Sequence, residues 1–273
     1  MECSTIDPGQ PGYGQDGHFP SGSLSYTDLG DGSVRDNRTG LVWSKAPDAE
    51  AVNWETAITT CSSKRWHLPN VVELLSLVDY SKPDCPRWDA VFGTSCRSLT
   101  WFWTSVPWSS SSAFYVIFSD GSVLYNGGGH GGDGVRCVRS VQDQLTDQAR
   151  FVDFGETVFD RLTGLEWEKV PLYSSGRTWA QALEDCMKSQ KAGGGWRLPN
   201  IKELYSIVEI RGEGTGCQWN KVFEGSCNLY WSSTPVPWSS SSAFGVNFRF
   251  GGVYGQYIGY SAGGVRCVRA GQE

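Results

Sequence analysis

Apolar residues spaced three and four positions apart predict the same amphipathic helix twice along this chain. Such spacing places side chains on one face of a helix, where they can pack against a core. The two series are Trp54, Ala57, Ile58 and Cys61, and Trp179, Ala182, Leu183 and Cys186. We therefore expect both helices to bury this face, with the cysteine on it.

A second helix is predicted directly after a Leu-Pro-Asn motif in each half of the chain. Asn70 and Asn200 stand at the expected N-cap, and Glu73 and Glu203 follow three residues later. This is the spacing of a capping box, with Asn in place of the usual Ser or Thr. Apolar residues then mark one face of each helix: Leu74, Leu77 and Val78, and Leu204, Ile207 and Val208.

The repeated elements divide the chain into two domains of the α+β class. Before the first helix of each, residues 34–43 and 158–167 place a polar turn ending in Gly between β-prone runs, which predicts a hairpin. The rest of each repeat is rich in Gly, Ser and aromatic residues and predicts short strands and long loops. The expected organisation is a flexible N-terminal tail over 1–23, a first repeat over 24–140, a linker over 141–147 and a second repeat over 148–273.

One stretch differs between the repeats although its flanks are identical. Val106–Phe114 recurs letter for letter as Val236–Phe244, and Val135–Arg139 recurs as Val265–Arg269. The segments between these blocks have equal length but agree at only six pairs of positions, which we call the frame: Val116/Val246, Phe118/Phe248, Gly121/Gly251, Val123/Val253, Gly129/Gly259 and Gly134/Gly264. A constant frame around changing residues is typical of a binding surface whose ligand varies. Drift of a Gly-rich loop after duplication is the alternative.

Alternation along this stretch predicts which residues face the solvent. Val116 and Phe118 alternate with changing residues, as do Val246 and Phe248, so period two puts the frame inside and the changing residues outside. The changing residues are rich in Tyr, Ser, Gly and Asn, as antibody paratopes are. The candidate ligand-binding residues are Tyr115, Ile117, Ser119, Asp120, Ser122, Leu124, Tyr125, Asn126, His130, Asp133, Gly245, Asn247, Arg249, Phe250, Gly252, Tyr254, Gln256, Tyr257, Ile258, Tyr260 and Ser261.

Three matching pairs of tryptophans are expected in the core rather than on a sugar-binding surface. They are Trp43/Trp167, Trp54/Trp179 and Trp66/Trp196. Trp108 and Trp238, which lie beside runs of serine, fit either role.

Composition and charge narrow the classes of partner. The chain has 273 residues and a formal net charge of −6 at pH 7. This balance argues against nucleic acid or an anionic membrane as the main partner, since both carry negative phosphates. No apolar run approaches the roughly 20 residues of a membrane span. The oligomeric state stays open.

Candidate catalytic and metal-binding groups are few. His18, His67 and His130 are scattered without a catalytic partner in the sequence, and no CxxC pair occurs. The serine runs at 109–112 and 239–242 lack a nucleophile elbow or a paired base. The calcium-dependent sugar-binding signatures of C-type lectins are absent from the sequence. We therefore expect no enzymatic activity, no cofactor and no bound metal.

The cysteines indicate an oxidising compartment. Each repeat has four in matching order, which fits two disulfides per domain, and eight reduced buried thiols are the alternative. No signal peptide precedes Cys3, so we expect that a secretion signal was removed or replaced and that the protein is extracytoplasmic, either secreted or on the cell surface. Cys3 itself is either a lipid-anchor site or an ordinary cysteine of the tail.

Three strings of the second repeat resemble the Lcl C-terminal domain family. They are Trp196–Leu204, Tyr230–Ser233 and Val265–Arg269. The first repeat carries the same landmarks as Trp66–Asn70 and Val135–Arg139, and it departs from them at Trp101–Ser105. The resemblance implies a C-type-lectin-like fold for each repeat, with two helices, a small antiparallel sheet and long ligand-binding loops. It also implies the disulfides Cys61–Cys137, Cys85–Cys96, Cys186–Cys267 and Cys217–Cys227.

The changing segments also resemble those of variable proteins of diversity-generating retroelements. Those systems randomise adenines, and a randomised Asn codon cannot yield Lys, Glu, Gln, Trp or Met. Among the 28 differing residues of the two segments, only Gln256 breaks this rule.

This second resemblance implies a ligand-recognition protein whose partner is a protein or glycan on another cell, a phage or a host surface. The alternatives are a fixed-specificity surface adhesin for polysaccharide or glycosaminoglycan, and an enzyme on the related formylglycine-generating fold.

Overall fold

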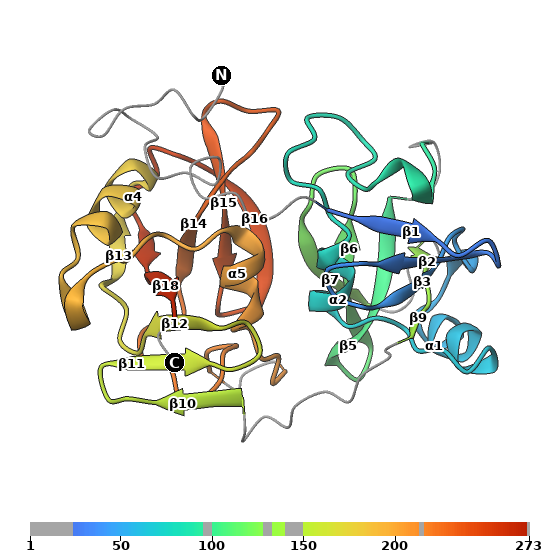
Figure 1. Ribbon diagram of the computed structural model, residues 1–273, viewed down its shortest axis with the longest axis horizontal. Helices are drawn as coiled ribbons and strands as arrows, with labels where there is room; N and C mark the ends of the chain where they lie inside the picture. Colours follow the sequence, from blue (N-terminus) through green and yellow to red (C-terminus); the bar gives the residue numbers. More distant parts are fainter. Residues whose placement is uncertain (1–23, 95–99, 128–132, 140–149, 213–215, 272–273) are drawn as a thin grey trace. The chain divides into compact units, whose positions relative to one another are not determined.

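The computed structural model describes residues 24–94, 100–127, 133–139, 150–212 and 216–271. The chain forms two compact units, one built mainly on Gly22–Asp143 and the other mainly on Gln144–Glu209 and Thr215–Glu273. Each unit combines two α-helices with two sheets, which confirms the α+β class (Figure 1). The expected tail over 1–23, with Cys3, and the expected linker over 141–147 lie outside the described residues.

The first unit begins with a four-stranded antiparallel sheet in the order β1-β2-β3-β9. Its strands are β1 (Tyr26–Asp28), β2 (Ser33–Asp36), β3 (Val42–Ser44) and β9 (Val138–Arg139). The pair β2–β3 is the hairpin predicted over residues 34–43.

The second sheet of this unit has five strands in the order β4-β8-β5-β6-β7, all antiparallel except the pair β5–β8. They are β4 (Ala49–Val52), β8 (Asp133–Val135), β5 (Trp101–Ser109), β6 (Ser112–Ile117) and β7 (Val123–Gly127). The helices are α1 (Trp54–Ser63), α2 (Val71–Ser76) and the 3-10 turn η3 (Ala90–Phe92).

The second unit repeats this plan. A four-stranded sheet in the order β10-β11-β12-β18 contains β10 (Phe151–Asp153), β11 (Thr157–Asp160), β12 (Leu165–Glu168) and β18 (Val268–Ala270). A five-stranded sheet in the order β13-β17-β14-β15-β16 contains β13 (Tyr173–Arg177), β17 (Gly263–Val265), β14 (Leu229–Pro235), β15 (Ser242–Asn247) and β16 (Gly252–Tyr257). The helices are α4 (Trp179–Lys188), α5 (Ile201–Ser206) and the 3-10 turn η4 (Lys191–Gly193).

The prediction of one small antiparallel sheet per repeat is wrong in the number of sheets and in the direction of one pair of strands. Each unit has two sheets, and β17 runs parallel to β14, with Gly264 opposite Tyr230. This close approach requires glycine, since a Cβ added at Gly264 would lie 2.7 Å from Tyr230 Cε1. The frame residue Gly264 therefore allows β17 to lie directly beside β14. The two-residue period of the sequence does not predict this pairing.

The helix predictions hold, with one exception. Asn70 and Asn200 each accept from the N3 amide while the N3 glutamate accepts from the N-cap amide, so both capping boxes form as predicted. In α4 all four residues of the apolar series are buried. In α1 only Ala57 and Cys61 are fully buried, whereas the Ile58 side chain is 39% exposed. The buried face of α1 is therefore narrower than expected.

Candidate binding site

The changing segment of each repeat begins within a strand, turns at the frame glycine and returns on the next strand. Its apolar frame residues are fully buried: Val116, Phe118 and Val123, and Val246, Phe248 and Val253. Phe248, for example, lies 4.9 Å from Trp219 and 5.5 Å from Tyr230 between ring centroids. The prediction that these frame residues form a constant inner face is confirmed.

The turn between the strands depends on a glycine and on the hydroxyl group of a tyrosine. Gly121 and Gly251 have φ of 75° and 72°, which non-glycine residues rarely adopt. Tyr80 Oη donates to the Gly121 carbonyl oxygen at 2.7 Å, and Tyr205 Oη donates to that of Gly251 at 2.9 Å. A Cβ at Gly121 would lie 2.5 Å from Tyr80 Cε1, so both backbone angle and space require glycine there. The sequence analysis missed both tyrosines, and they do not occupy matching positions: Tyr80 corresponds to Ile210, and Tyr205 corresponds to Leu75.

The changing residues of the second repeat reach the surface beyond this turn. The Tyr257 side chain is 65% exposed and that of Tyr260 is 47% exposed. Arg249 and Ser261 are also exposed, whereas the half-buried candidates are Asn247, Phe250, Tyr254, Gln256 and Ile258. Asn247 ends β15, Arg249 and Phe250 lie in the turn between the strands, and the remaining residues lie on β16 or directly after it.

Gly245 and Gly252 were predicted to lie outside, but the structure buries both. A Cβ added at Gly245 would lie 2.7 Å from the Tyr230 carbonyl oxygen, and one at Gly252 would lie 2.7 Å from Tyr254 Cε2. Close contacts fill the space beside both positions, so the prediction of outward-facing residues is wrong for them.

The prediction is also wrong for Tyr115 and Ile117 of the first repeat, which are only 4% and 5% exposed. Both pack in one core cluster with Ala57 and Cys61 of α1. Tyr115 also stacks on Trp101 with the ring planes 6° apart. Successive strand residues do point to opposite faces, but α1 covers the face that the prediction left open to solvent.

The remaining candidates of the first repeat lie beyond the buried part of β6. Ser119, Asp120, Ser122, Leu124 and Tyr125 are half-buried. Asn126 and Asp133 belong to β7 and β8 by their backbone, and His130 lies outside the described residues.

The repeated Val-Arg-Cys-Val-Arg motif has a structural role. Arg266 is fully buried, its Nη1 donates to the carbonyl oxygens of Glu168 and Lys169, and its guanidinium lies 4.8 Å from the centre of the Trp219 ring. Arg136 repeats this arrangement, with its guanidinium 5.0 Å from the Phe92 ring. Burial lowers the pKa of both arginines to about 10, so they remain cations at neutral pH. Neither is accessible to a ligand, and the sequence analysis did not foresee this role.

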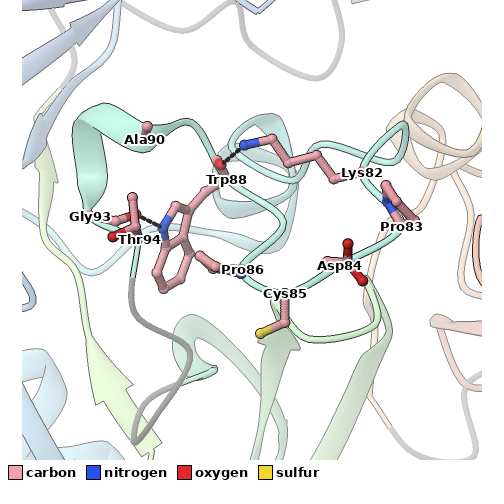
Figure 2. Close-up of a pocket in the computed structure, with 9 residues that line it drawn as sticks. All are labelled: Lys82, Pro83, Asp84, Cys85, Pro86, Trp88, Ala90, Gly93 and Thr94. Atoms are coloured by element: carbon pink, nitrogen blue, oxygen red, sulfur yellow. Dashed lines mark hydrogen bonds between the residues drawn. The ribbon is translucent and has the colours of Figure 1, made fainter.

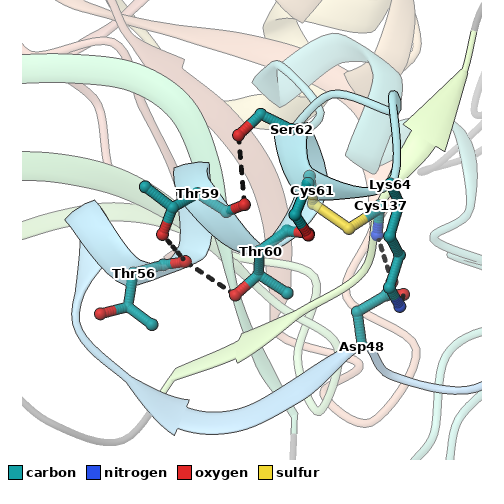
Figure 3. The surroundings of a disulfide bond; sticks show 9 residues. Asp48, Thr56, Thr59, Thr60, Cys61, Ser62, Lys64 and Cys137 are labelled. Carbon is teal, nitrogen blue, oxygen red and sulfur yellow. Dashed lines mark hydrogen bonds and ion pairs between the residues drawn. A yellow bond between two sulfur atoms is a disulfide. The ribbon is translucent and has the colours of Figure 1, made fainter.

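Disulfides connect the first helix of each repeat to this motif, as the resemblance implied. Cys61 pairs with Cys137 and Cys186 pairs with Cys267. Figure 3 shows Asp48 beside the first of these bridges, where its carboxylate accepts from the Cys137 amide at 2.7 Å and forms an ion pair with Lys64.

The third disulfide, Cys217–Cys227, is confirmed as well. Cys85 is also disulfide-bonded, and its expected partner Cys96 lies outside the described residues. Disulfides of this number are typical of an oxidising, extracytoplasmic compartment. The described part of the chain contains no helix that is long and apolar enough to cross a membrane.

The loop around Cys85 surrounds a shallow hollow of about 260 Å³ (Figure 2). The Trp88 ring forms one wall, and its Nε1 donates to the Gly93 carbonyl oxygen at 2.8 Å. Lys82 Nζ donates to the Trp88 carbonyl oxygen at 2.5 Å and closes the loop from the other side. The charged residues that line this hollow are Lys82 and Asp84, and the described residues contain no group of His, Cys, Asp and Glu that could hold a metal ion.

His67 has a structural role that explains its replacement by arginine in the second repeat. His67 Nε2 lies 3.1 Å from the carboxylate of Glu73, the capping-box residue of α2, and this bond raises the pKa of His67. In the second repeat, Arg197 forms two hydrogen bonds of 2.7 Å with Glu203. Each repeat thus places a cation against the carboxylate that caps its second helix.

The first repeat should lose stability as the pH rises through the pKa of His67 in the folded protein. A raised pKa means that the ion pair contributes fully below the ordinary value of about 6.5 and is lost above the folded value. The loss should stay below about 1 kcal/mol, because 47% of the His67 side chain is exposed. Urea denaturation at about pH 5.5 and about pH 8.5 measures it. In His67→Arg the dependence should disappear, and its persistence would contradict this role.

The fold and the site together define a protein of two tandem α+β domains, each closed by disulfides and each carrying changing residues on a constant frame. The family model of the Lcl C-terminal domain matches residues 32–139 and 156–269, and the chain therefore belongs to that family. The resemblance of both repeats to this family is thereby confirmed. No curated protein matches the sequence.

Proposed function

We propose that this protein recognises ligands through a hypervariable face on each repeat and is a variable protein of a diversity-generating retroelement. Its two domains adopt a C-type-lectin-like fold and perform recognition, not catalysis. Its partner is a protein or glycan on another cell, a phage or a host surface. The protein acts outside the cytoplasm, either secreted or displayed on the cell surface with Cys3 as the candidate lipid-anchor site.

One observation carries this proposal: the positions that stay constant are those that the fold requires. Val246, Phe248 and Val253 are completely buried, and Gly251 has a backbone angle that favours glycine. The residues that change most in character lie beyond this turn, where Tyr257 and Tyr260 are exposed. Drift in a loop has no reason to preserve segment length and flanking sequence around such a surface.

A fixed-specificity adhesin for polysaccharide or glycosaminoglycan is the second candidate. It is favoured by exposed aromatic side chains of the second repeat, among them Trp238, Tyr257 and Tyr260. Aromatic faces bind the apolar faces of sugar rings, and such exposed groups mark interaction surfaces. The net charge of −6 disfavours a polyanionic ligand.

Sequencing the same gene in sibling strains separates the two candidates. If the face is diversified, substitutions should be confined to 115–133 and 245–263, and the frame positions Val246, Phe248 and Val253 should stay unchanged. The new residues should exclude Lys, Glu, Trp and Met. The region Trp196–Leu204, which contains the capping box of α5, is the internal control because it should not vary. Substitutions spread evenly over the surface of both repeats would overturn the proposal.

A further inference from the structure

The arginine that ends the repeated Val-Arg-Cys-Val-Arg motif has a different cross-strand neighbour in each repeat. Arg139 on β9 pairs with Val42 on β3, and Arg269 on β18 pairs with Glu166 on β12. Residues paired across antiparallel strands lie on the same face of a sheet, so their side chains are neighbours. The two arginines therefore occupy one position of the fold and differ in the residue beside them.

In the second repeat the chain itself supplies the acceptors for this arginine. Arg269 Nε and Nη2 donate to the two carboxylate oxygens of Glu166 at 3.0 and 3.1 Å. Its Nη1 donates to the carbonyl oxygens of Ala192 and Gly194, both at 2.8 Å. The guanidinium lies 4.5 Å from the centre of the Trp196 ring, and only 12% of the side chain is exposed. One carboxylate and two peptide carbonyl groups thus bind this guanidinium.

The first repeat lacks both kinds of acceptor. Val42 replaces the glutamate, and residues 62–65 replace the longer segment 187–195 that supplies the two carbonyl oxygens. Arg139 keeps its place over the matching tryptophan, 4.8 Å from the centre of the Trp66 ring, and is exposed. Among the residues that the structure describes, no carboxylate or carbonyl group accepts a hydrogen bond from the Arg139 side chain.

A second hollow, of about 350 Å³, lies beside Arg139 and is within the size range of ligand pockets. Ser44 also lines it and lies two residues from Val42 on β3, so the hollow is on the same face of the sheet as Val42. Lys64 is another lining residue, but its ammonium group is paired with the Asp48 carboxylate (Figure 3). These two charges therefore balance each other.

The remaining charges favour an anion at this site. Arg35 on β2 is the other cross-strand neighbour of Val42 and is exposed, so Val42 lies between two arginines. Asp31 also lines the hollow, where its carboxylate accepts from the amide and the hydroxyl group of Ser33. Two arginines and one carboxylate leave a net positive charge.

We propose that Arg139 binds an acidic side chain of a partner protein, with its guanidinium holding the partner's carboxylate as Arg269 holds that of Glu166. The occupant is a polypeptide, because the acceptors that the first repeat lacks are a carboxylate and two peptide carbonyl groups, and an acidic peptide supplies both. Stacking on Trp66 orients the guanidinium before binding, and its paired donors match a carboxylate. The site lies on the four-stranded sheet and uses none of the changing residues, so it does not rest on the proposed function.

Titration of the full-length, ¹⁵N-labelled protein with the peptide acetyl-Gly-Glu-Gly-amide tests this site. We expect the Arg139 Nε–H and Trp66 indole N–H resonances to shift with half-saturation on the order of 1 mM. Arg139→Gln and Trp66→Phe assign the two resonances by their loss. Acetyl-Gly-Gln-Gly-amide has the same length but no charge, and its shift should be about tenfold smaller at equal concentration.

Three variants separate the paired donors of the guanidinium from its charge alone. Val42→Glu gives the first repeat the carboxylate that Glu166 supplies in the second, and it should reduce the shift at Trp66 about tenfold. Arg139→Lys keeps the charge but removes the paired donors, and it should reduce the same shift about tenfold. It decides the matter if Val42→Glu does not fold. Arg269→Lys, at the position whose acceptors are internal, should leave the shift at Trp66 unchanged.

The site is overturned if neither resonance responds to the glutamate peptide, or if Arg139→Lys leaves the response intact. An equal response to the glutamine peptide, or to sodium acetate at the same concentration, would overturn it as well. A stronger response to methyl glucuronoside would assign the hollow to an acidic sugar and reject the peptide. None of these results bears on the pattern of variation among sibling strains, which tests the proposed function separately.

Discussion

Replacing Phe248 by alanine should lower the free energy of unfolding of the second repeat by about 3–5 kcal/mol. Phe248 is completely buried and contacts the rings of Trp219 and Tyr230. Its removal leaves a cavity between rings that are held by other elements, since Tyr230 belongs to the central strand β14. The surroundings therefore cannot close the gap without moving the sheet.

Tyr257→Ala is the matched control, nine residues further along the same segment. Because 65% of its side chain is exposed, this substitution should change stability by no more than about 0.5 kcal/mol. Hydrogen-exchange mass spectrometry in increasing urea measures both variants on peptides of the second repeat alone. Similar losses in the two variants would contradict the division into a buried frame and an outer face.

The features that the sequence predicts well are local ones. Asn70 and Asn200 cap their helices as expected, because every donor and acceptor of a capping box lies within four residues of the others. The hairpin β2–β3 is predicted for the same reason. The disulfide pairs join distant residues, and they were available only from the resemblance to a family.

The two-residue period of the strands does not predict correctly which changing residues are exposed to solvent. The alternation of residues along a strand predicts that Tyr115 and Val116 point to opposite faces of β6, and the structure agrees. The alternation does not predict which of the two faces is covered by another element. In the first repeat α1 supplies Ala57 and Cys61 to the second face, and Tyr115 is buried there. Burial of this kind depends on where a helix packs, which a strand's own sequence does not contain.

The two repeats share one fold, so a residue that differs between them can be compared at the same position of the structure. His67 and Arg197 place different cations on the same capping carboxylate. Tyr125 and Gly255 likewise occupy the same register but leave the neighbouring tryptophan in different environments. In the first case the interaction is kept, whereas in the second the exposed fraction of the tryptophan rises from 7% for Trp108 to 46% for Trp238.

Removing the disulfide between Cys186 and Cys267 should have the largest effect on the second repeat. The bridge spans a sequence separation of 81 residues, and in the chain-entropy model a loop of this length stabilises the folded state by about 4–5 kcal/mol. Both cysteines are fully buried, so alanine at both positions also removes packing between α4 and the strand end.

The bridge Cys217–Cys227 provides the matched control, because it spans a separation of only 10 residues and its cysteines are half-buried. The same model gives it about 3 kcal/mol. Double alanine variants of each pair, compared by hydrogen exchange in urea on peptides of the second repeat, should therefore rank the long bridge above the short one. The first repeat should keep its wild-type exchange in both variants. Equal losses for the two bridges would show that loop length does not govern their contribution, and loss of protection in the first repeat would show that the two domains do not unfold independently.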